Sequence, residues 1–271
     1  MARSYLFWGQ SATWKTSAAL LDATPEHPVS YQELEAGGFR RATDRLDIPE
    51  GAIYLRQHKR PFDGLEQIGS IIKTNAGNVM PQLKYELDGW VDMFSSFTRS
   101  YTDDIRAGRR PVVDTATRCW LMLRQFYNEM VQKATAGRDA DNLGQMKFTT
   151  PNDLMLQLLE YPKAYDIDSV WIAHEEREFG SDPPIYKADT MKEVPNNIDV
   201  SLRFKLVSNK GVATFTKGGE VGDLVGLEVP EPTLRKFNAI LDIYPVLLKE
   251  DGEVEKDADY LISQATLRGL Y

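Results

Sequence analysis

One stretch near the start of the chain decides its fold: Tyr5-Leu6-Phe7-Trp8-Gly9-Gln10-Ser11-Ala12-Thr13-Trp14-Lys15-Thr16, followed by Ser17-Ala18-Ala19-Leu20-Leu21. The first four residues are apolar, the middle is polar and begins with glycine, and the end is rich in helix formers. This succession predicts a buried strand, a tight loop and a helix. The sequence therefore predicts an α/β fold that opens with a strand-loop-helix unit over residues 4–24.

The loop of this unit has most of the residues of a phosphate-binding loop. The pattern G-x-x-x-x-G-K-[ST] is matched at Gly9, Lys15 and Thr16, whereas Trp14 replaces the second glycine. In such loops backbone N–H groups surround a polyphosphate, the lysine reaches the outer phosphates, and the hydroxyl that follows binds Mg²⁺. We therefore assign nucleotide binding to Gly9, Gln10, Ser11, Ala12, Thr13, Trp14, Lys15, Thr16 and Ser17.

Trp14 is the departure from the pattern. Because tryptophan lacks the freedom of glycine at positive φ, we expect ordinary backbone dihedrals at this position. The indole either covers the nucleotide or packs against the protein, and the sequence does not decide between the two.

The remaining elements indicate a mainly parallel sheet flanked by helices. Strands are predicted at 29–34, 52–55, 111–114 and 169–173, and helices at about 81–107, from Trp120 onward and at about 151–163. A hairpin at 199–207 and 211–216 is expected to add antiparallel strands to one edge, before a final helix at 233–241. Residues 135–150 are polar and are predicted to form a loop.

Length and composition bound the class of protein. The chain has 271 residues, 27% charged and 42% hydrophobic, which suits one domain with a core over about 1–207 and a C-terminal hairpin and helix over about 208–271. No apolar run approaches the roughly 20 residues of a membrane-spanning helix, and no signal peptide is recognisable. The single cysteine, Cys119, excludes an intrachain disulfide. We expect a cytoplasmic protein with no membrane partner.

Three further polar side chains lie at predicted strand ends, where open α/β sheets bind their ligands. Asp114 is assigned to Mg²⁺ together with Thr16, with their oxygens roughly 4–7 Å apart at the ends of near-neighbour strands; the alternative is a helix cap. Glu35 is assigned to the attacking water, since Glu33 points to the other strand face. His174 is assigned to hydrogen bonding near the γ-phosphate, or else is a core group.

Basic residues form local clusters despite a net charge of −8. They are Arg40-Arg41 with Arg45, Arg56 with Lys59-Arg60, and Arg106 with Arg109-Arg110. An acidic total excludes a protein that coats nucleic acid with its whole surface. Single-stranded DNA remains a candidate partner through Arg40 and Arg41 if the clusters converge.

With these residues assembled, the chain resembles the phage-encoded, RecA-like AAA-type P-loop ATPases, a group that includes single-strand-annealing recombination proteins. The resemblance rests on five segments. They are Gly9–Thr16 as Walker A, Glu33–Gly38 as an acidic-Gly-Gly turn, Val112–Thr115 as Walker B, Ile172–Glu175 at the following strand end, and Asp199–Leu206 as a late strand. It implies ATP and ADP binding, Mg²⁺-dependent hydrolysis with Lys15, Glu35 and His174 as catalytic groups, rings or filaments, and action on single-stranded DNA in recombination or replication.

Two other functions stay open. Trp14 favours a nucleotide-binding or DNA-binding recombination accessory that hydrolyses little or nothing. Many small-molecule kinases share the loop, and residues 135–150 would then close over the site.

Overall fold

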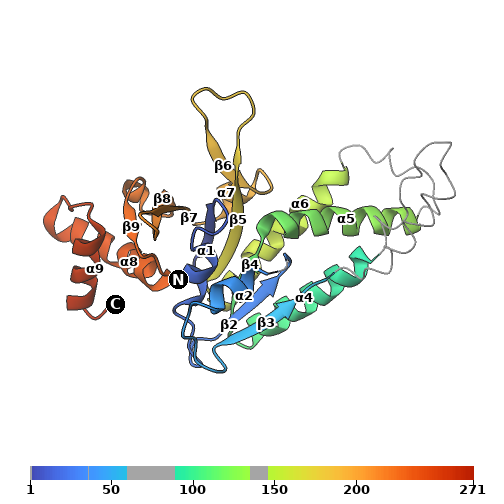
Figure 1. The fold of residues 1–271 in the computed structure, drawn as a ribbon, viewed down its shortest axis with the longest axis horizontal. Coiled ribbons are helices and arrows are strands. Elements are labelled where there is room, and N and C mark those ends of the chain that lie inside the picture. The colour runs from blue at the N-terminus through green and yellow to red at the C-terminus, as the bar shows by residue number, and fades with distance from the viewer. Residues whose placement is uncertain (1, 36, 60–88, 135–145) are drawn as a thin grey trace.

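The computed structural model describes residues 2–35, 37–59, 89–134 and 146–271 (Figure 1). The predicted helix from residue 81 and the predicted loop at 135–150 therefore lie partly outside the described residues. The strand-loop-helix unit is present as β1 (Ser4–Gly9) and α1 (Lys15–Leu20), joined by the loop Gln10–Trp14.

One sheet organises the described part of the chain. Its strands run in the order β3-β2-β4-β5-β1-β7-β8-β9, with β6 paired to β5. Their bounds are β2 (Val29–Glu33), β3 (Ile53–Gln57), β4 (Arg110–Asp114), β5 (Ser169–Arg177), β6 (Tyr186–Asp189), β7 (Val200–Val207), β8 (Lys210–Gly218) and β9 (Glu228–Pro230).

The direction of the strands confirms the predicted fold class. The pairs formed among β3, β2, β4, β5, β1 and β7 are parallel, whereas β7–β8, β8–β9 and β5–β6 are antiparallel. The sheet is thus mainly parallel, with antiparallel strands toward the C-terminal side. Because parallel strands share one carboxyl edge, the ends of β1, β2, β4 and β5 lie along the same rim.

Helices cover both faces of the sheet (Figure 1). They are α2 (Gly38–Thr43), α4 (Trp90–Arg106), α5 (Ala116–Ala134), α6 (Met146–Glu160), α7 (Val194–Asn197), α8 (Leu234–Asp251) and α9 (Ala258–Leu267), with short 3₁₀ turns at Tyr161–Tyr165 and Gly222–Leu224. None of the described helices is long and apolar enough to cross a membrane.

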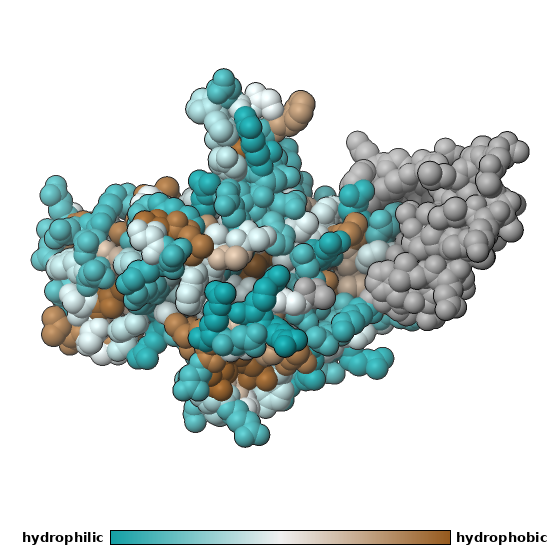
Figure 2. All heavy atoms as spheres, in the orientation of Figure 1, coloured by the Kyte–Doolittle hydropathy of each residue, from teal (hydrophilic) through white to brown (hydrophobic). Residues whose placement is uncertain are grey.

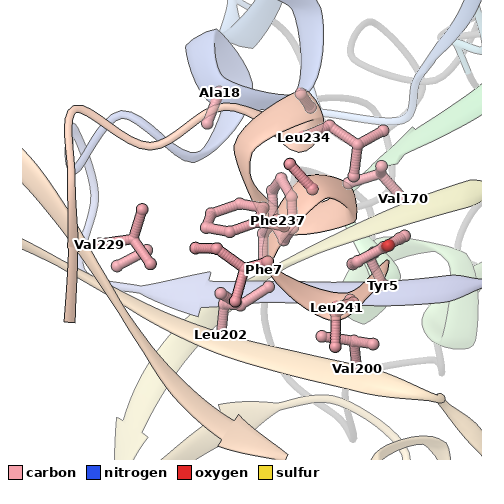
Figure 3. Packing of buried hydrophobic residues seen from close by; sticks show 14 of the residues in the cluster. Tyr5, Phe7, Ala18, Val170, Val200, Leu202, Val229, Leu234, Phe237 and Leu241 are labelled. Atoms are coloured by element: carbon pink, nitrogen blue, oxygen red, sulfur yellow. The ribbon is translucent and has the colours of Figure 1, made fainter. Parts of the chain in front are cut away.

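The alternation of β1 produces two apolar cores. Tyr5 and Phe7 belong to the core under α1, α8 and α9, whereas Leu6 and Trp8 belong to the core under α4, α5 and α6. Figure 3 shows Phe7 beside Phe237 of α8, with ring centroids 5.5 Å apart. Since all four side chains are buried, β1 is held from both faces and its end at Gly9 is a rigid support for the loop.

Three predicted boundaries are wrong. β5 does not stop at His174 but continues to Arg177, because β6 supplies a hydrogen-bonding partner for its extension. The two strands form the arm that rises above the sheet in Figure 1 and is mainly hydrophilic in Figure 2. Helix α6 begins at Met146, inside the predicted loop, and the C-terminal region contains α9 in addition to the longer α8.

Candidate functional site

The loop between β1 and α1 contains an unusual run of backbone conformations. Gly9, Ala12 and Trp14 have φ values of 147°, 61° and 70°. Trp14 therefore lies in the left-handed region, and the predicted ordinary dihedrals at this position are wrong. A left-handed conformation costs a residue with a Cβ about 1–2 kcal/mol, so other contacts must hold Trp14 there.

One such contact is the packing of the indole on the start of strand β8. A Cβ placed on Gly211 would lie 2.9 Å from Cγ and 3.0 Å from Cβ of Trp14, so the ring rests directly on the glycine backbone. Trp14 also borders the pocket described below and is 36% exposed. The indole thus packs against the protein, which was one of the two alternatives that the sequence left open.

Lys15 is folded back into the loop. Its Nζ donates hydrogen bonds to the carbonyl oxygens of Gly9 at 2.9 Å and Gln10 at 2.5 Å, and to Oγ1 of Thr13 at 3.2 Å. The side chain is buried, and this burial lowers the pKa of Lys15 to about 8, although the charges of Asp114 and Glu175 oppose the shift. The direct partners of this ammonium group are neutral oxygens, and an anion in the loop would give it a negatively charged partner.

Thr16 and Asp114 meet directly. Oγ1 of Thr16 donates to Oδ2 of Asp114 at 3.2 Å, closer than the 4–7 Å that the sequence predicts. Their strands are not neighbours, since β5 lies between β1 and β4. The contact arises because Thr16 lies one residue into α1, which reaches over β5 at the common rim.

A residue that sequence reasoning missed completes this group. The hydroxyl of Tyr31, on β2, donates to the same Oδ2 of Asp114. Burial raises the pKa of the Asp114 carboxyl, and the hydrogen bonds from Tyr31 and Thr16 partly counter that rise. The only signal in the sequence is the position of Tyr31, two residues before Glu33 on a predicted strand.

Glu35 and His174 form a pair at the same rim. Oε2 of Glu35 lies 3.2 Å from Nε2 of His174, and the two side chains are 39% and 37% exposed. His174 is opposite Gly9 in the β1–β5 register, which brings the pair next to the loop. A carboxylate held by an imidazole at the entrance of a pocket is suited to orient a water molecule.

Glu33 has a different environment. It is buried and accepts hydrogen bonds from the backbone N–H groups of Gly37 at 3.2 Å and Phe39 at 3.3 Å, and from the amide of Gln57 at 2.7 Å. These contacts anchor the start of α2. Glu33 thus has a structural role. This agrees with the choice of Glu35 over Glu33 as the catalytic candidate.

A cavity of about 300 Å³ connects these groups. It is lined by the loop from Ser11 to Ser17, by Glu35, Asp114 and His174, and by Arg41 of α2 and Arg45 just beyond the end of that helix. The pocket brings together the loop, Glu35, Asp114 and His174 as the sequence predicts. Arg41 was predicted as a candidate DNA contact and Arg45 only as part of the same basic cluster.

The donor set suits Mg²⁺ and a polyphosphate. The hydroxyl of Thr16 and the carboxylate of Asp114 are hard oxygen ligands, and Mg²⁺ in such sites keeps several water molecules and binds substrate phosphates. Among the residues that the structure describes, no cluster of three or more His, Cys, Asp or Glu could hold a metal without such help. These residues therefore fit an ion that arrives with a phosphate ligand.

The other basic clusters are largely engaged within the protein. Arg56 donates to both carboxylate oxygens of buried Asp104 at 2.8 Å, and Arg109 donates to Oδ1 at 2.5 Å. Arg110 is bonded to the carbonyl of Ala19, while Arg60 lies outside the described residues. Arg56 and Arg109 thus converge on one acidic partner, Asp104.

The similarity of this chain to known proteins is limited. No family model matches the sequence, and neither does any curated protein. Among solved structures, the crystal structure of the RadB recombinase is similar, with 20% sequence identity, 79% of this chain and 80% of that chain covered, and a TM-score of 0.39. The α/β architecture is therefore the one that the strand order and pairing show, and the assignment of an activity rests on the pocket.

Proposed function

We propose that this protein is a P-loop ATPase that binds Mg²⁺ and ATP in the pocket between α1 and α2. The observation that carries the proposal is the meeting of Lys15, Thr16 and Asp114 at one rim, from elements separated by about 100 residues of sequence. A lysine inside a loop of this shape, with a hydroxyl and a carboxylate in contact beside it, is the arrangement that phosphoryl transfer uses.

The residues have separate roles in hydrolysis. Lys15 leaves the loop carbonyls and donates to the outer phosphates, where it stabilises developing negative charge. Thr16 and Asp114 would hold Mg²⁺, and the ion would neutralise charge on the phosphate oxygens. Glu35, positioned by His174, orients the water whose oxygen bonds to the γ-phosphorus. The bond to the bridging oxygen breaks, and ADP and phosphate leave.

The setting of this activity is also part of the proposal. The resemblance supports a phage-encoded, AAA-type recombination or replication protein that acts with single-stranded DNA as a ring or filament. Arg40 and Arg41 are exposed on α2 and remain the candidate DNA contacts. The kinase alternative depends on residues 135–150, most of which lie outside the described residues.

A binding protein with little hydrolysis is the second candidate, and one observation favours it. Trp14 holds the loop in a left-handed conformation through its packing on Gly211, and Lys15 is held by three loop oxygens. Both features resist rearrangement of the loop during a catalytic cycle. Binding of a polyphosphate requires only that Lys15 exchange these loop oxygens for phosphate oxygens once.

Measuring ATP binding and turnover, each with and without Mg²⁺ and single-stranded DNA, tests the proposal. We expect Mg²⁺-dependent binding and turnover that DNA stimulates. Binding without turnover would support the accessory function, and phosphate transfer to an added acceptor would support a kinase. An absence of ATP binding in the presence of Mg²⁺ would contradict the site assignment itself.

The affinity for ATP is expected to fall as pH rises above 8. Because burial lowers the pKa of Lys15 to about 8 in the free protein and bound phosphates favour the charged amine, binding above pH 8 takes up a proton. The affinity for ATP should then decrease by up to about tenfold per pH unit above pH 8. Well below pH 8 the amine is already charged, so Lys15 adds no pH dependence to the affinity there. Titration calorimetry in two buffers of different ionisation enthalpy, between pH 7.5 and 9.5, measures the proton uptake. A constant affinity with no uptake at pH 9 would be the opposite result.

A further inference from the structure

Helix α2 is docked tightly against the metal-binding side of the pocket. A Cβ on Gly38, its first residue, would lie 2.6 Å from Oδ2 of Asp114 and 2.9 Å from the hydroxyl of Tyr31. The buried carboxylate of Glu33 also accepts hydrogen bonds from the backbone at Gly37 and Phe39. The first turn of the helix is therefore held close to Asp114 and Tyr31.

Two of those side chains are arginines. Arg41 and Arg45 are four residues apart, Arg45 in the turn directly after the helix, and both line the pocket with Ala42 between them. Residues at this spacing lie on one side of a helical turn. The α2 side of the pocket thus carries two positive charges, and the surface over α2 is hydrophilic in Figure 2.

These charges have no partner within the described protein. No hydrogen bond or ion pair of either guanidinium group is present among the described residues, whereas Arg56 and Arg109 each bind Asp104 and Arg203 binds Glu175. The acidic groups of the same pocket are already engaged, Glu35 by His174 and Asp114 by Thr16 and Tyr31. The pocket accordingly has a surplus of positive charge on the α2 side.

We propose that Arg41 and Arg45 bind the phosphate chain of the nucleotide directly, from the α2 side of the pocket that Lys15 also lines. The inference rests on the proposed function, since it names further ligands for the same pocket. A guanidinium group matches phosphate oxygens with paired N–H donors, and such charge-assisted bonds are stronger than neutral ones. Two arginines make the site selective for a nucleoside triphosphate over a monophosphate. They also make Arg41 a nucleotide ligand in place of a DNA contact.

The test compares ligands that differ in phosphate number. Binding of ATP, AMP and inorganic tripolyphosphate, with Mg²⁺, is measured for the wild type, Arg41→Ala and Arg45→Ala. Arg99→Ala is the matched control, because Arg99 is an exposed helical arginine of α4, which covers the opposite face of the sheet. We expect each pocket variant to lose about tenfold in affinity for ATP and tripolyphosphate and much less for AMP, as loss of a solvent-accessible charged hydrogen bond predicts. Arg99→Ala should bind all three ligands like the wild type.

Each of the other outcomes contradicts either the nucleotide site or the role of the two arginines. If the wild type binds no ATP, the proposed function fails and this inference fails with it. If the wild type binds ATP and both variants bind it equally well, only the role of the arginines is wrong. Equal losses for ATP and AMP with unchanged tripolyphosphate binding would assign the arginines to the nucleoside. Loss of single-stranded DNA binding with unchanged ATP affinity would return Arg41 to DNA.

Discussion

Lys15→Ala is expected to abolish nucleotide binding while leaving the fold intact. In the free protein the ammonium group is bonded only to loop oxygens, and burial destabilises its charged form. Its removal should therefore leave the free energy of unfolding nearly unchanged. In the complex the same group would be the positive charge closest to the phosphates, and its charged hydrogen bonds are each worth about 1.5–3 kcal/mol. The expected loss of ATP affinity is therefore about a hundredfold or more.

Equilibrium binding of ATP with Mg²⁺ measures this loss, and the midpoint of thermal unfolding monitors the fold. Lys15→Met is the companion variant, because methionine keeps most of the side-chain volume and removes only the charge. Both variants should lose binding to the same extent if the charge is responsible. Unchanged ATP affinity in a folded Lys15→Ala protein would end the assignment of this loop to phosphate.

Gly9→Ala is expected to prevent stable folding. A Cβ on Gly9 would lie 2.2 Å from the carbonyl oxygen of Phe204, which is the register partner of Gly9 on β7. That oxygen belongs to the backbone of a central strand and cannot move without breaking the β1–β7 pairing, and Gly9 also has a positive φ of 147°. We expect a loss of about 4 kcal/mol or more in the free energy of unfolding, at the upper end for single substitutions.

Gly51→Ala is the control that separates the steric clash from the cost of a positive φ. Gly51 also has a positive φ, 80°, but a Cβ there would meet nothing within 4 Å, so this variant carries only the backbone cost of about 1 kcal/mol. Urea unfolding followed by circular dichroism compares both variants with the wild type. If the Gly9→Ala protein unfolds at the same urea concentration as the Gly51→Ala protein, the backbone of β7 at Phe204 can shift to make room for the added methyl group.

Much of the candidate site was predictable because its signals are local. The apolar run before Gly9, the Lys15-Thr16 pair at a helix start and the carboxylate of Asp114 after an apolar strand are each contained within a few residues. Strand periodicity then places such groups at one edge of a parallel sheet, where Lys15, Thr16, Asp114, Glu35 and His174 do lie. Their roles in ATP hydrolysis stay predictions until binding and turnover are measured.

The sequence by itself determined the α/β class, the strand-loop-helix unit and the polar residues of the rim, because periodicity and turn chemistry act over short distances along the chain. Only the tertiary structure decided that β5 separates β1 from β4, that Trp14 adopts a left-handed conformation, and that Arg41 and Arg45 line the same pocket as the loop. Each of these depends on contacts between residues far apart in sequence, such as Trp14 with Gly211 or Gly38 with Asp114. Close packing selects among the conformations that local preferences allow, and at Trp14 it overrides the preference of the residue itself.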